Sequence, residues 1–326
     1  MRTFSQLFPC IFGSKKKSRI YKIVKILKGQ NWDKATRSPL SEIGVDVKEG
    51  EFILAINGKP VNEVNNIYEL LENKAGKQVT LKINSSPKIE GSREAVVVPT
   101  DDEQPLYYYN WVQNNIEKVN NATDGKVGYI HIPDMGVNGL NQFSKLYYPQ
   151  LRKEALIIDD RGNGGGNVSP MIIERLRREW TMVGIARNAA PTYDPGGMHV
   201  GPKVGLIDEF SASDGDIFGY RFKQAKLGKL IGKRSWGGVV GIRGTLPFVD
   251  GGFLNRPEFS RYDNDGKKWI MEGYGVDPDI FVDNDPALES EGVDQQLDKA
   301  IQVALEELKT AKNKIPEAPV YPNKSK

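Results

Sequence analysis

Hydrophobic and polar residues alternate in short runs along the first hundred residues of the chain, as in a small β-rich domain. Ile67, Leu70 and Leu71 recur at helical spacing and predict one helix in this domain. The Asn57-Gly58 pair is typical of a hairpin turn. Four runs have the pattern of strands and cover residues 21–26, 51–56, 79–83 and 94–98.

The pattern changes after residue 125. Apolar runs at 127–132, 155–159 and 204–207 predict buried strands, and runs at 140–148 and 169–180 predict helices between them. This alternation is typical of an α/β domain. A last helix, over residues 294–308, has its apolar residues on one face, which predicts packing against the core.

These patterns divide the chain into five segments. The aromatic residues 107–109 and Trp111 are predicted to pack one domain against the next rather than to stack on a ligand. We predict a disordered leader (1–17), a β-rich domain (18–100), a connecting segment with a helix across 111–119 (101–124), an α/β domain (125–310) and a disordered tail (311–326).

Composition excludes several classes of protein. The 326 residues include 45 basic and 42 acidic side chains in a mixed arrangement, so no field of one sign indicates nucleic acid. One cysteine excludes a disulfide framework, and with only two histidines we expect neither a metal nor an organic cofactor.

Two features bear on location. No apolar run approaches the roughly 20 residues that span a bilayer, so we predict no transmembrane segment. The N-terminal apolar patch precedes its lysines, the reverse of a secretory signal. We expect a cytoplasmic protein, with a secreted or periplasmic one as the alternative.

Ser213 is the first candidate for chemistry. It follows the strand-like run at 204–207 and precedes a helical run, so its hydroxyl can lie beside the first N–H groups of a helix. Those groups would stabilise an oxyanion formed at the serine. The alternative is a helix N-cap, because Asp216 follows three residues later.

A glycine-rich turn is the second candidate. It follows the run at 155–159 and reads Asp160-Arg161-Gly162-Asn163-Gly164-Gly165-Gly166. A phosphate-binding loop is disfavoured, because neither the P-loop ending nor the dinucleotide spacing fits. The turn predicts an oxyanion site, formed with the N–H of Asp214; alternatively, the glycines only permit a tight turn.

Glu272 is the third candidate. It lies in the turn-rich sequence Met271-Glu272-Gly273-Tyr274-Gly275-Val276-Asp277-Pro278. A carboxylate there could orient a catalytic base, or it could simply face solvent.

Five blocks in this order resemble the tail-specific, or C-terminal processing, serine proteases, and specifically their tricorn branch. They cover residues 128–136, 163–166, 213–216, 230–241 and 272–278, within a resemblance that runs from about 18 to 308. The resemblance implies a crotonase-like α/β core. It also implies that Ser213 is the nucleophile, that Gly166 and Asp214 supply the oxyanion N–H groups, and that Glu272 belongs to the charge relay. Homo-oligomers are usual in this branch.

Residues 50–61 resemble the central segment of the PDZ domains that accompany bacterial proteases. Such domains commonly bind an extended peptide beside a strand and a helix. The alternative is a small β-rich domain that only packs on its neighbour.

The chain departs from the family at the catalytic base. Where the serine–lysine branch has its lysine, this chain has Gly238. The tricorn branch has a histidine preceded by a serine, ahead of the PDZ domain, and neither His131 nor His199 follows a serine. Both histidines stay base candidates, although the position of His131 in a strand is more typical of a core residue. Residues 183–188 contain no acid, so a preference for basic side chains does not carry over.

We therefore predict a serine peptidase that acts on peptides or unfolded proteins, including their carboxy-terminal regions, through an acyl-enzyme at Ser213. The missing base segment indicates either a piece of a longer peptidase or a derivative that has lost catalysis. The retained nucleophile, glycine turn and glutamate favour the first. The alternatives are a catalytically inactive PDZ-containing peptide-binding protein and an acyl-thioester enzyme, and the latter does not explain Ser213.

Overall fold

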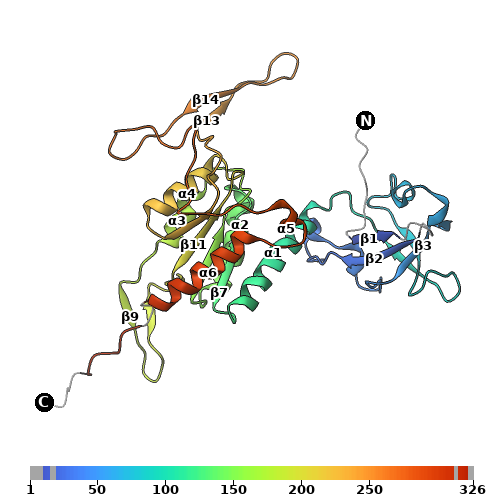
Figure 1. The fold of residues 1–326 in the computed structure, drawn as a ribbon, viewed down its shortest axis with the longest axis horizontal. Helices are drawn as coiled ribbons and strands as arrows, with labels where there is room; N and C mark the ends of the chain where they lie inside the picture. Colours follow the sequence, from blue (N-terminus) through green and yellow to red (C-terminus); the bar gives the residue numbers. More distant parts are fainter. Residues whose placement is uncertain (1–9, 15–19, 312–314, 322–326) are drawn as a thin grey trace. The chain divides into compact units, whose positions relative to one another are not determined.

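The computed structural model describes residues 10–14, 20–311 and 315–321. The chain divides into two compact units, Met1–Asn114 and Asn115–Lys326, and helix α1 (Gln104–Ala122) begins in the first and ends in the second (Figure 1). Each unit has its own hydrophobic core. Among the described helices, none combines the length and the apolar character that crossing a membrane requires.

The first unit is built around an antiparallel sheet with the strand order β1-β2-β3-β5-β6, in which β4 pairs with β3. Asn57 and Gly58 have φ values of 49° and 79° and make the predicted turn between β3 and β4. Ile53, Leu81 and Val97 point into the core. The strands are β1 (Cys10–Ser14), β2 (Tyr21–Ile26), β3 (Phe52–Ile56), β4 (Lys59–Pro60), β5 (Val79–Asn84) and β6 (Arg93–Val97).

Two segments of this unit differ from the predictions. Cys10–Ser14, predicted within a disordered leader, form β1, which pairs with an edge of β2 that would otherwise be open. The rest of that leader lies outside the described residues. The helix predicted around Ile67 is a single 3₁₀ turn, η4 (Ile67–Leu70), because Asn73 soon afterwards takes a left-handed φ of 58°. The other 3₁₀ turns described in this unit are η1 (Lys34–Thr36), η2 (Pro39–Ser41) and η3 (Val61–Glu63).

The second unit contains a parallel sheet with the strand order β15-β12-β11-β8-β7. The predicted buried strands are confirmed, and every residue of β7, β8 and β11 is buried. Since the strands are parallel, their carboxyl ends lie at one edge of the sheet, where ligands bind in many α/β proteins. The strands are β7 (Val127–His131), β8 (Ala155–Asp159), β11 (Lys203–Ile207), β12 (Gly228–Gly232) and β15 (Ile280–Phe281).

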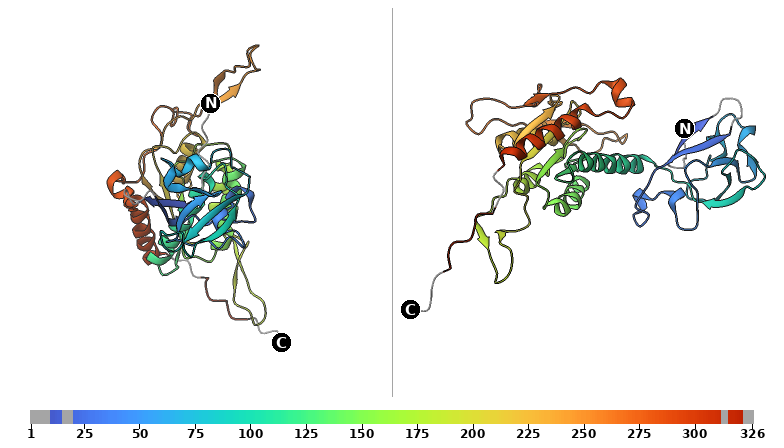
Figure 2. Two further views of the ribbon diagram at one scale, coloured as in Figure 1. Left: turned by 90° about the vertical axis from the view of Figure 1, so that its right-hand side faces the viewer. Right: turned by 60° about the horizontal axis from the view of Figure 1, so that its bottom comes forward.

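Helices cover both faces of this sheet (Figures 1 and 2). Helix α6 contacts strands β7, β8, β11 and β12 on one face. Ile158, Ile207 and Leu230 point to the other face and pack with residues of α2, α3 and α4. The helices are α2 (Val137–Tyr147), α3 (Ser169–Leu176), α4 (Asp214–Gln224), α5 (Pro286–Ser290) and α6 (Gln295–Thr310), and the 3₁₀ turn η5 (Tyr148–Gln150) follows α2.

The helices agree with the predicted runs to within a few residues, except that α1 is much longer than the helix predicted across 111–119. Two antiparallel ribbons were not predicted: β9 (Met182–Gly184) with β10 (Thr192–Asp194), and β13 (Gly241–Gly244) with β14 (Asn255–Phe259). Of the predicted disordered tail, residues 315–321 contain neither helix nor strand, and 312–314 and 322–326 lie outside the described residues.

Candidate active site

Ser213 lies beyond the carboxyl end of β11, immediately before helix α4. Its backbone has φ 56° and ψ −116°, a conformation that residues with a Cβ rarely adopt. Such a conformation costs on the order of 1–3 kcal/mol and persists only where its surroundings enforce it. Ser213 occupies the N-cap position, but its side chain makes no capping hydrogen bond. Capping therefore does not explain this serine, whereas a strained strand-to-helix turn is a known way to present a nucleophile.

Hydrogen bonds join the turn of Ser213 to the glycine-rich turn after β8. The N–H of Ala212 donates to the carbonyl of Asn163 at 2.7 Å. The N–H of Gly162 donates to the carboxylate of Asp208 at 2.9 Å. The two motifs found in the sequence therefore form one continuous structure at the edge of the sheet.

Gly165 and Gly166 allow the backbone of the glycine turn to approach its neighbours closely. Gly165 has φ +95°, and a Cβ there would lie 2.6 Å from the Cβ of Ser213 and 2.9 Å from the backbone nitrogen of Asp214. Gly166 has φ +147°, and a Cβ there would lie 2.1 Å from the carbonyl oxygen of Met135. Both positions therefore require glycine.

The backbone N–H groups of Gly166 and Asp214 have no acceptor among the residues that the structure describes. Asp214 is the first residue of α4, and the N–H groups and dipole at a helix N-terminus favour an anion. Because a Cβ added to Gly165 would lie only 2.9 Å from the Asp214 nitrogen, the two unpaired groups belong to neighbouring backbone segments. An oxyanion site needs two free backbone donors, and the assignment of Gly166 and Asp214 to that role stays a prediction.

The side chain of Asp214 is anchored to the start of helix α3. Its carboxylate accepts hydrogen bonds from the N–H and the hydroxyl of Ser169, at 2.9 and 2.6 Å. Arg221 donates to the same hydroxyl at 2.6 Å and lies 3.9 Å from the carboxylate. These contacts fix the residue that supplies one of the two free N–H groups.

Asp216 connects α4 to the segment that holds Glu272. Its buried carboxylate accepts hydrogen bonds from the Ser235 hydroxyl and from the Gly237 N–H, the latter at 2.7 Å. Burial raises the pKa of this carboxyl, and the hydrogen bonds from Ser235 and Gly237 oppose the rise. The same hydroxyl accepts from the N–H of Val276 at 2.8 Å, so the turn after Glu272 is held as well.

Glu272 itself is exposed, and its carboxylate accepts hydrogen bonds from the N–H groups of Val239 and Val240, both at 2.7 Å. The same segment reaches the nucleophile turn, because the N–H of Trp236 donates to the carbonyl of Ser211 at 3.0 Å. Within the described residues no hydrogen bond joins the carboxylate directly to the nucleophile hydroxyl. The segment around 235–240 is the link between them.

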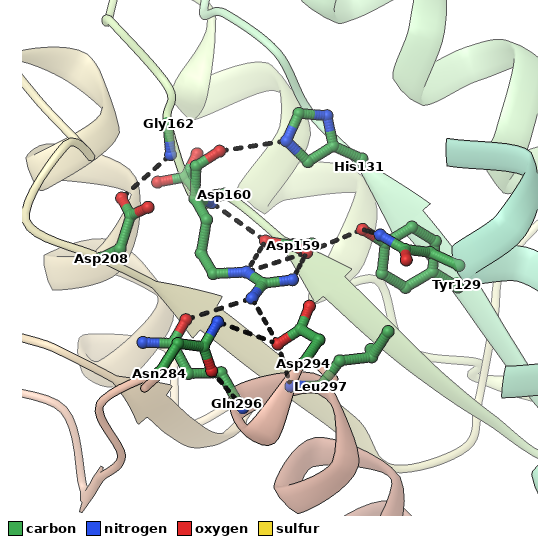
Figure 3. Close-up of polar contacts among 12 residues, drawn as sticks. Tyr129, His131, Asp159, Asp160, Gly162, Asp208, Asn284, Asp294, Gln296 and Leu297 are labelled. Atoms are coloured by element: carbon green, nitrogen blue, oxygen red, sulfur yellow. Dashed lines mark hydrogen bonds and ion pairs between the residues drawn. The ribbon is translucent and has the colours of Figure 1, made fainter. Parts of the chain in front are cut away.

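A buried ion network fixes the start of the glycine turn (Figure 3). Arg161 pairs with Asp159 of β8 at 2.6 Å and with Asp294, the N-cap of α6, at 2.9 Å. The Tyr129 hydroxyl donates to Asp159 at 2.7 Å. Burial raises the pKa of the Asp159 carboxyl, but the charge and hydrogen bonds of Arg161, together with His131 and Tyr129, hold that pKa below its usual value.

Asp160 is fully buried next to this network. One carboxyl oxygen accepts from the Asn163 amide at 2.9 Å, and the other has no partner among the described residues. Burial and the neighbouring carboxylates of Asp159 and Asp208 raise its pKa well above the usual value. A neutral carboxylic acid is therefore favoured at this position.

The side chain of His131 is hydrogen-bonded on the face of the sheet opposite to the helix that follows Ser213. It pairs with Asp159 across β7 and β8 and points to the face of the sheet that carries this network, as Figure 3 shows. Its Nε2 lies 3.0 Å from the Arg161 carbonyl, which can only accept, so Nε2 carries the proton. Burial lowers the pKa of the imidazole. Ser213 instead immediately precedes α4, which packs on the opposite face.

His199 lies at the other edge of the sheet. It precedes the amino end of β11, whereas Ser213 follows the carboxyl end, and a strand of this length spans about 16 Å. Its Nε2 donates to the Lys153 carbonyl at 2.9 Å. Burial and the charge of Lys203 lower its pKa to about 3. The structure therefore does not support His199 as the base for Ser213.

The sequence did not reveal the residues that support this site, notably Ser169, Arg221, Asp216 and Ser235. The contact between Ser169 and Asp214 spans 45 positions, and the pair of Arg161 and Asp294 spans 133. The one local signal was an arginine inside the glycine-rich motif. Among the described residues, no group of three potential ligands from His, Cys, Asp and Glu is placed to hold a metal ion.

Two family matches cover most of the chain. Residues 10–102 match the tricorn protease PDZ domain, and residues 126–282 match peptidase family S41. The tricorn protease of Thermoplasma acidophilum is 38% identical over 299 residues, which are 92% of this chain and 28% of that protein. The putative tricorn-like protease C-terminal subunit of Sulfurisphaera tokodaii is 39% identical over 294 residues, 90% of this chain and 33% of that protein.

A crystal structure of the tricorn protease matches 93% of this chain with a TM-score of 0.84 and 36% identity. The match covers 29% of that chain, so this protein spans about a third or less of the length of these relatives. The predicted fold, a PDZ-like domain followed by an α/β core, is confirmed. The chain is therefore homologous to part of the tricorn proteases and consists of a tricorn-type PDZ domain followed by a peptidase family S41 domain.

Proposed function

We propose that this chain is the nucleophile-bearing part of a serine peptidase that acts on peptides or unfolded proteins. The observation that carries the proposal is the strained Ser213, with φ 56°, beside the unpaired N–H groups of Gly166 and Asp214. A presented hydroxyl and two backbone donors are what acyl transfer requires. The match to peptidase family S41 supports the same chemistry.

In the proposed reaction, the Ser213 oxygen attacks the carbonyl carbon of a peptide bond and gives its proton to a base. The carbonyl oxygen becomes an oxyanion, which the N–H groups of Gly166 and Asp214 stabilise. The oxyanion collapses, the C–N bond breaks, and the leaving amine takes the proton from the base. Water then repeats the attack on the ester and releases the acid. Glu272 belongs to the relay that orients the base.

Neither of the two histidines of this chain supplies the base that this mechanism requires. His131 is bonded on the other face of the sheet and His199 lies at the other edge. We propose that the base comes from a serine–histidine segment outside these 326 residues. The relative named as a C-terminal subunit supports a site that another polypeptide segment completes.

We also propose that the chain self-associates and acts in the cytoplasm, with the tricorn resemblance as support. Light scattering coupled to size exclusion tests the first point, because a homo-oligomer has a multiple of the 36.4 kDa chain mass. Cell fractionation tests the second. A monomer at micromolar concentration, or a secreted protein, would contradict the respective proposal.

Labelling with a fluorophosphonate, mapped to individual serines by mass spectrometry, tests the nucleophile. Imidazole is added as a diffusible replacement for the missing base. We expect slow labelling without imidazole and an acceleration with imidazole that is confined to Ser213. Glu272→Gln should label at a comparable rate, since its amide oxygen can still accept from Val239 and Val240 and the base that Glu272 would orient is absent. Ser213→Ala is the control for site, and the urea-unfolded chain gives the rate for serines that no structure activates.

Labelling of Ser213 no faster than in the unfolded chain, at every imidazole concentration, would overturn the proposal. Loss of the acceleration in Gly166→Ala would support the proposal. The added Cβ would clash with the Met135 carbonyl and displace the N–H of residue 166, one of the two oxyanion donors. A folded chain without labelling would favour the alternative, a catalytically inactive PDZ-containing protein. In that case fluorescence polarisation should detect binding of extended peptides.

A further inference from the structure

A cationic cavity of about 680 Å³ lies in the second unit, away from the Ser213 turn. Its walls come from the segments that follow helices α3 and α4 and from the segment before strand β11. It therefore lies at the amino edge of β11, whereas Ser213 follows the carboxyl end. Its volume falls in the range of about 300–1,000 Å³ that is typical of small-molecule sites.

The charged groups of this cavity are mostly positive. Arg177, Arg178, Lys203 and Lys226 line it, with Glu179 as the one acid in the lining. Within the described part of the chain, none of these four cations forms an ion pair with a carboxylate. The cavity thus has an excess of positive charge that its single acid, Glu179, offsets only in part, and such an excess attracts anions.

Lys203 is the most informative of the four. Its side chain is buried, with 8% of the residue exposed, and burial lowers its pKa to about 8. The ammonium donates to the carbonyls of His199 and Gly201, both at 3.1 Å, which leaves one of its three donors unused. Buried charges in proteins are normally paired with an opposite charge. An anion in the cavity would supply that missing partner.

Helix C-termini by themselves favour cations, and this effect accounts in part for Arg177 and Lys226, which follow the ends of α3 and α4. It does not account for Lys203, which begins strand β11 and is buried. A flat interaction with an acidic protein surface also leaves Lys203 unexplained, because the two arginines are exposed whereas Lys203 is buried. A small anion that enters the cavity would pair with Lys203, which is part of its lining.

We propose that this cavity binds a small oxyanion of the phosphate class, which the buried Lys203 and the exposed Arg177, Arg178 and Lys226 would hold. Guanidinium groups bind the oxygens of phosphate in pairs, and the ammonium acts as a point charge. The apolar wall formed by Leu176 and Leu227 leaves room for a larger group attached to the phosphate. The anion is therefore either free or part of a larger molecule, and the shared chemistry is the phosphate.

Isothermal titration of the full chain with pyrophosphate tests the proposal. We expect saturable binding with one site per chain. Arg177→Gln/Arg178→Gln/Lys226→Gln should weaken it at least tenfold, because three of the four cations are lost. The control is Lys59→Gln/Lys77→Gln/Lys88→Gln, which removes three exposed charges from the first unit and should stay within twofold of wild type. If ATP binds more tightly than pyrophosphate, the ligand of the cavity is a phosphate attached to a larger group. If ATP binds equally or more weakly, the ligand is the free anion.

Sulfate provides a test in which the charge of the ligand does not change with pH. Its binding should weaken as the pH rises through about 8, because Lys203 loses its proton there. His199 and Glu179 also face the cavity, and burial lowers the pKa of His199 to about 3. In Lys203→Met, the part of the pH dependence that belongs to Lys203 should disappear.

Several results would overturn the proposal. One is no saturable binding of pyrophosphate or sulfate to the folded wild-type chain at millimolar concentration. Another is equal affinity of the basic triple variant and its control. Binding of a polyglutamate peptide without any binding of the small anions would instead assign the cavity to an acidic protein segment.

Discussion

The carboxylate of Asp214 accepts two hydrogen bonds from Ser169, at 2.9 Å from its N–H and at 2.6 Å from its hydroxyl. Both residues are buried, and each begins a helix, α4 and α3 respectively. The bonds tie the backbone of Asp214, one of the proposed oxyanion donors, to a second helix. Positioning of the donor therefore depends on a residue that has no part in the chemistry.

We predict that Ser169→Ala lowers both stability and reactivity. A hydrogen bond to a charged group contributes about 1.5–3 kcal/mol, so the free energy of unfolding should fall by about that amount. The labelling rate of Ser213 with imidazole should fall about tenfold or more, because small displacements of catalytic groups have large effects. Urea denaturation and labelling measure the two. Ser260→Ala, at an exposed position, is the control, and equal behaviour of the two variants would contradict the positioning role.

Gly165→Ala should abolish the labelling of Ser213 even if the chain folds. The added Cβ would lie 2.6 Å from the Ser213 Cβ, at a residue whose φ of +95° already disfavours alanine. The neighbouring Gly164→Ala is a matched control, since a Cβ there meets no atom within 4 Å. We expect the control to label within about threefold of wild type. Similar loss in both variants would mean that the turn tolerates no substitution, and that the contact with Ser213 is not the reason.

Local sequence patterns predict the candidate nucleophile and the glycine turn. They do not predict the distant residues that hold these two segments in place. The strands at 155–159 and 204–207 are short runs with Asp159 as their one charged residue, so their apolar character predicts them. The glycine turn directly follows the first strand and Ser213 lies a few residues beyond the second, so a parallel sheet brings them to the same edge. The partner of Arg161 is 133 positions away, and no local pattern specifies it. The run around Ile67 has helical spacing, yet the left-handed Asn73 limits it to one turn.

Arg161→Met should be strongly destabilising at neutral pH. The substitution leaves Asp159 buried without its counter-ion, and breaking a buried pair in this way costs about 3–5 kcal/mol. Arg187→Met, at an exposed position without an ion pair among the described residues, should change stability by less than about 0.5 kcal/mol. Adding Asp159→Asn to the variant should restore part of the loss, because it removes the unpaired charge. No recovery in the double variant would contradict this account.

The loss of stability in Arg161→Met should itself depend on pH. In the wild type the folded pKa of Asp159 is below its usual value, so its stabilisation is present at neutral pH and is lost as the pH falls through the folded pKa. Without Arg161, burial alone raises this pKa, and the penalty is relieved as Asp159 takes up a proton. The difference in free energy of unfolding between wild type and Arg161→Met should therefore shrink from pH 7 towards pH 4. Urea titrations at several pH values measure it, and a constant difference would contradict the prediction.

Asp160→Asn should make the chain more stable, by an amount that grows with pH. Burial and the carboxylates of Asp159 and Asp208 raise the folded pKa of Asp160 well above its usual value of 3.8, so the folded state holds a proton that the unfolded state releases. Wild-type stability should therefore fall as the pH rises from about 4 towards the folded pKa, and the asparagine variant, which has no proton to lose, should not share that fall.

The same substitution separates charge from shape at the oxyanion site. Asparagine keeps the size of Asp160 and an oxygen to accept from Asn163, so the glycine turn should keep its position. If Asp160 is already neutral, the labelling rate of Ser213 should be unchanged, because no negative charge near the oxyanion has been removed. Urea titrations from pH 5 to 8, with Asp101→Asn as the exposed control, measure the stability difference. A difference independent of pH, together with faster labelling in Asp160→Asn, would show instead that Asp160 is ionised in the folded chain and opposes oxyanion formation.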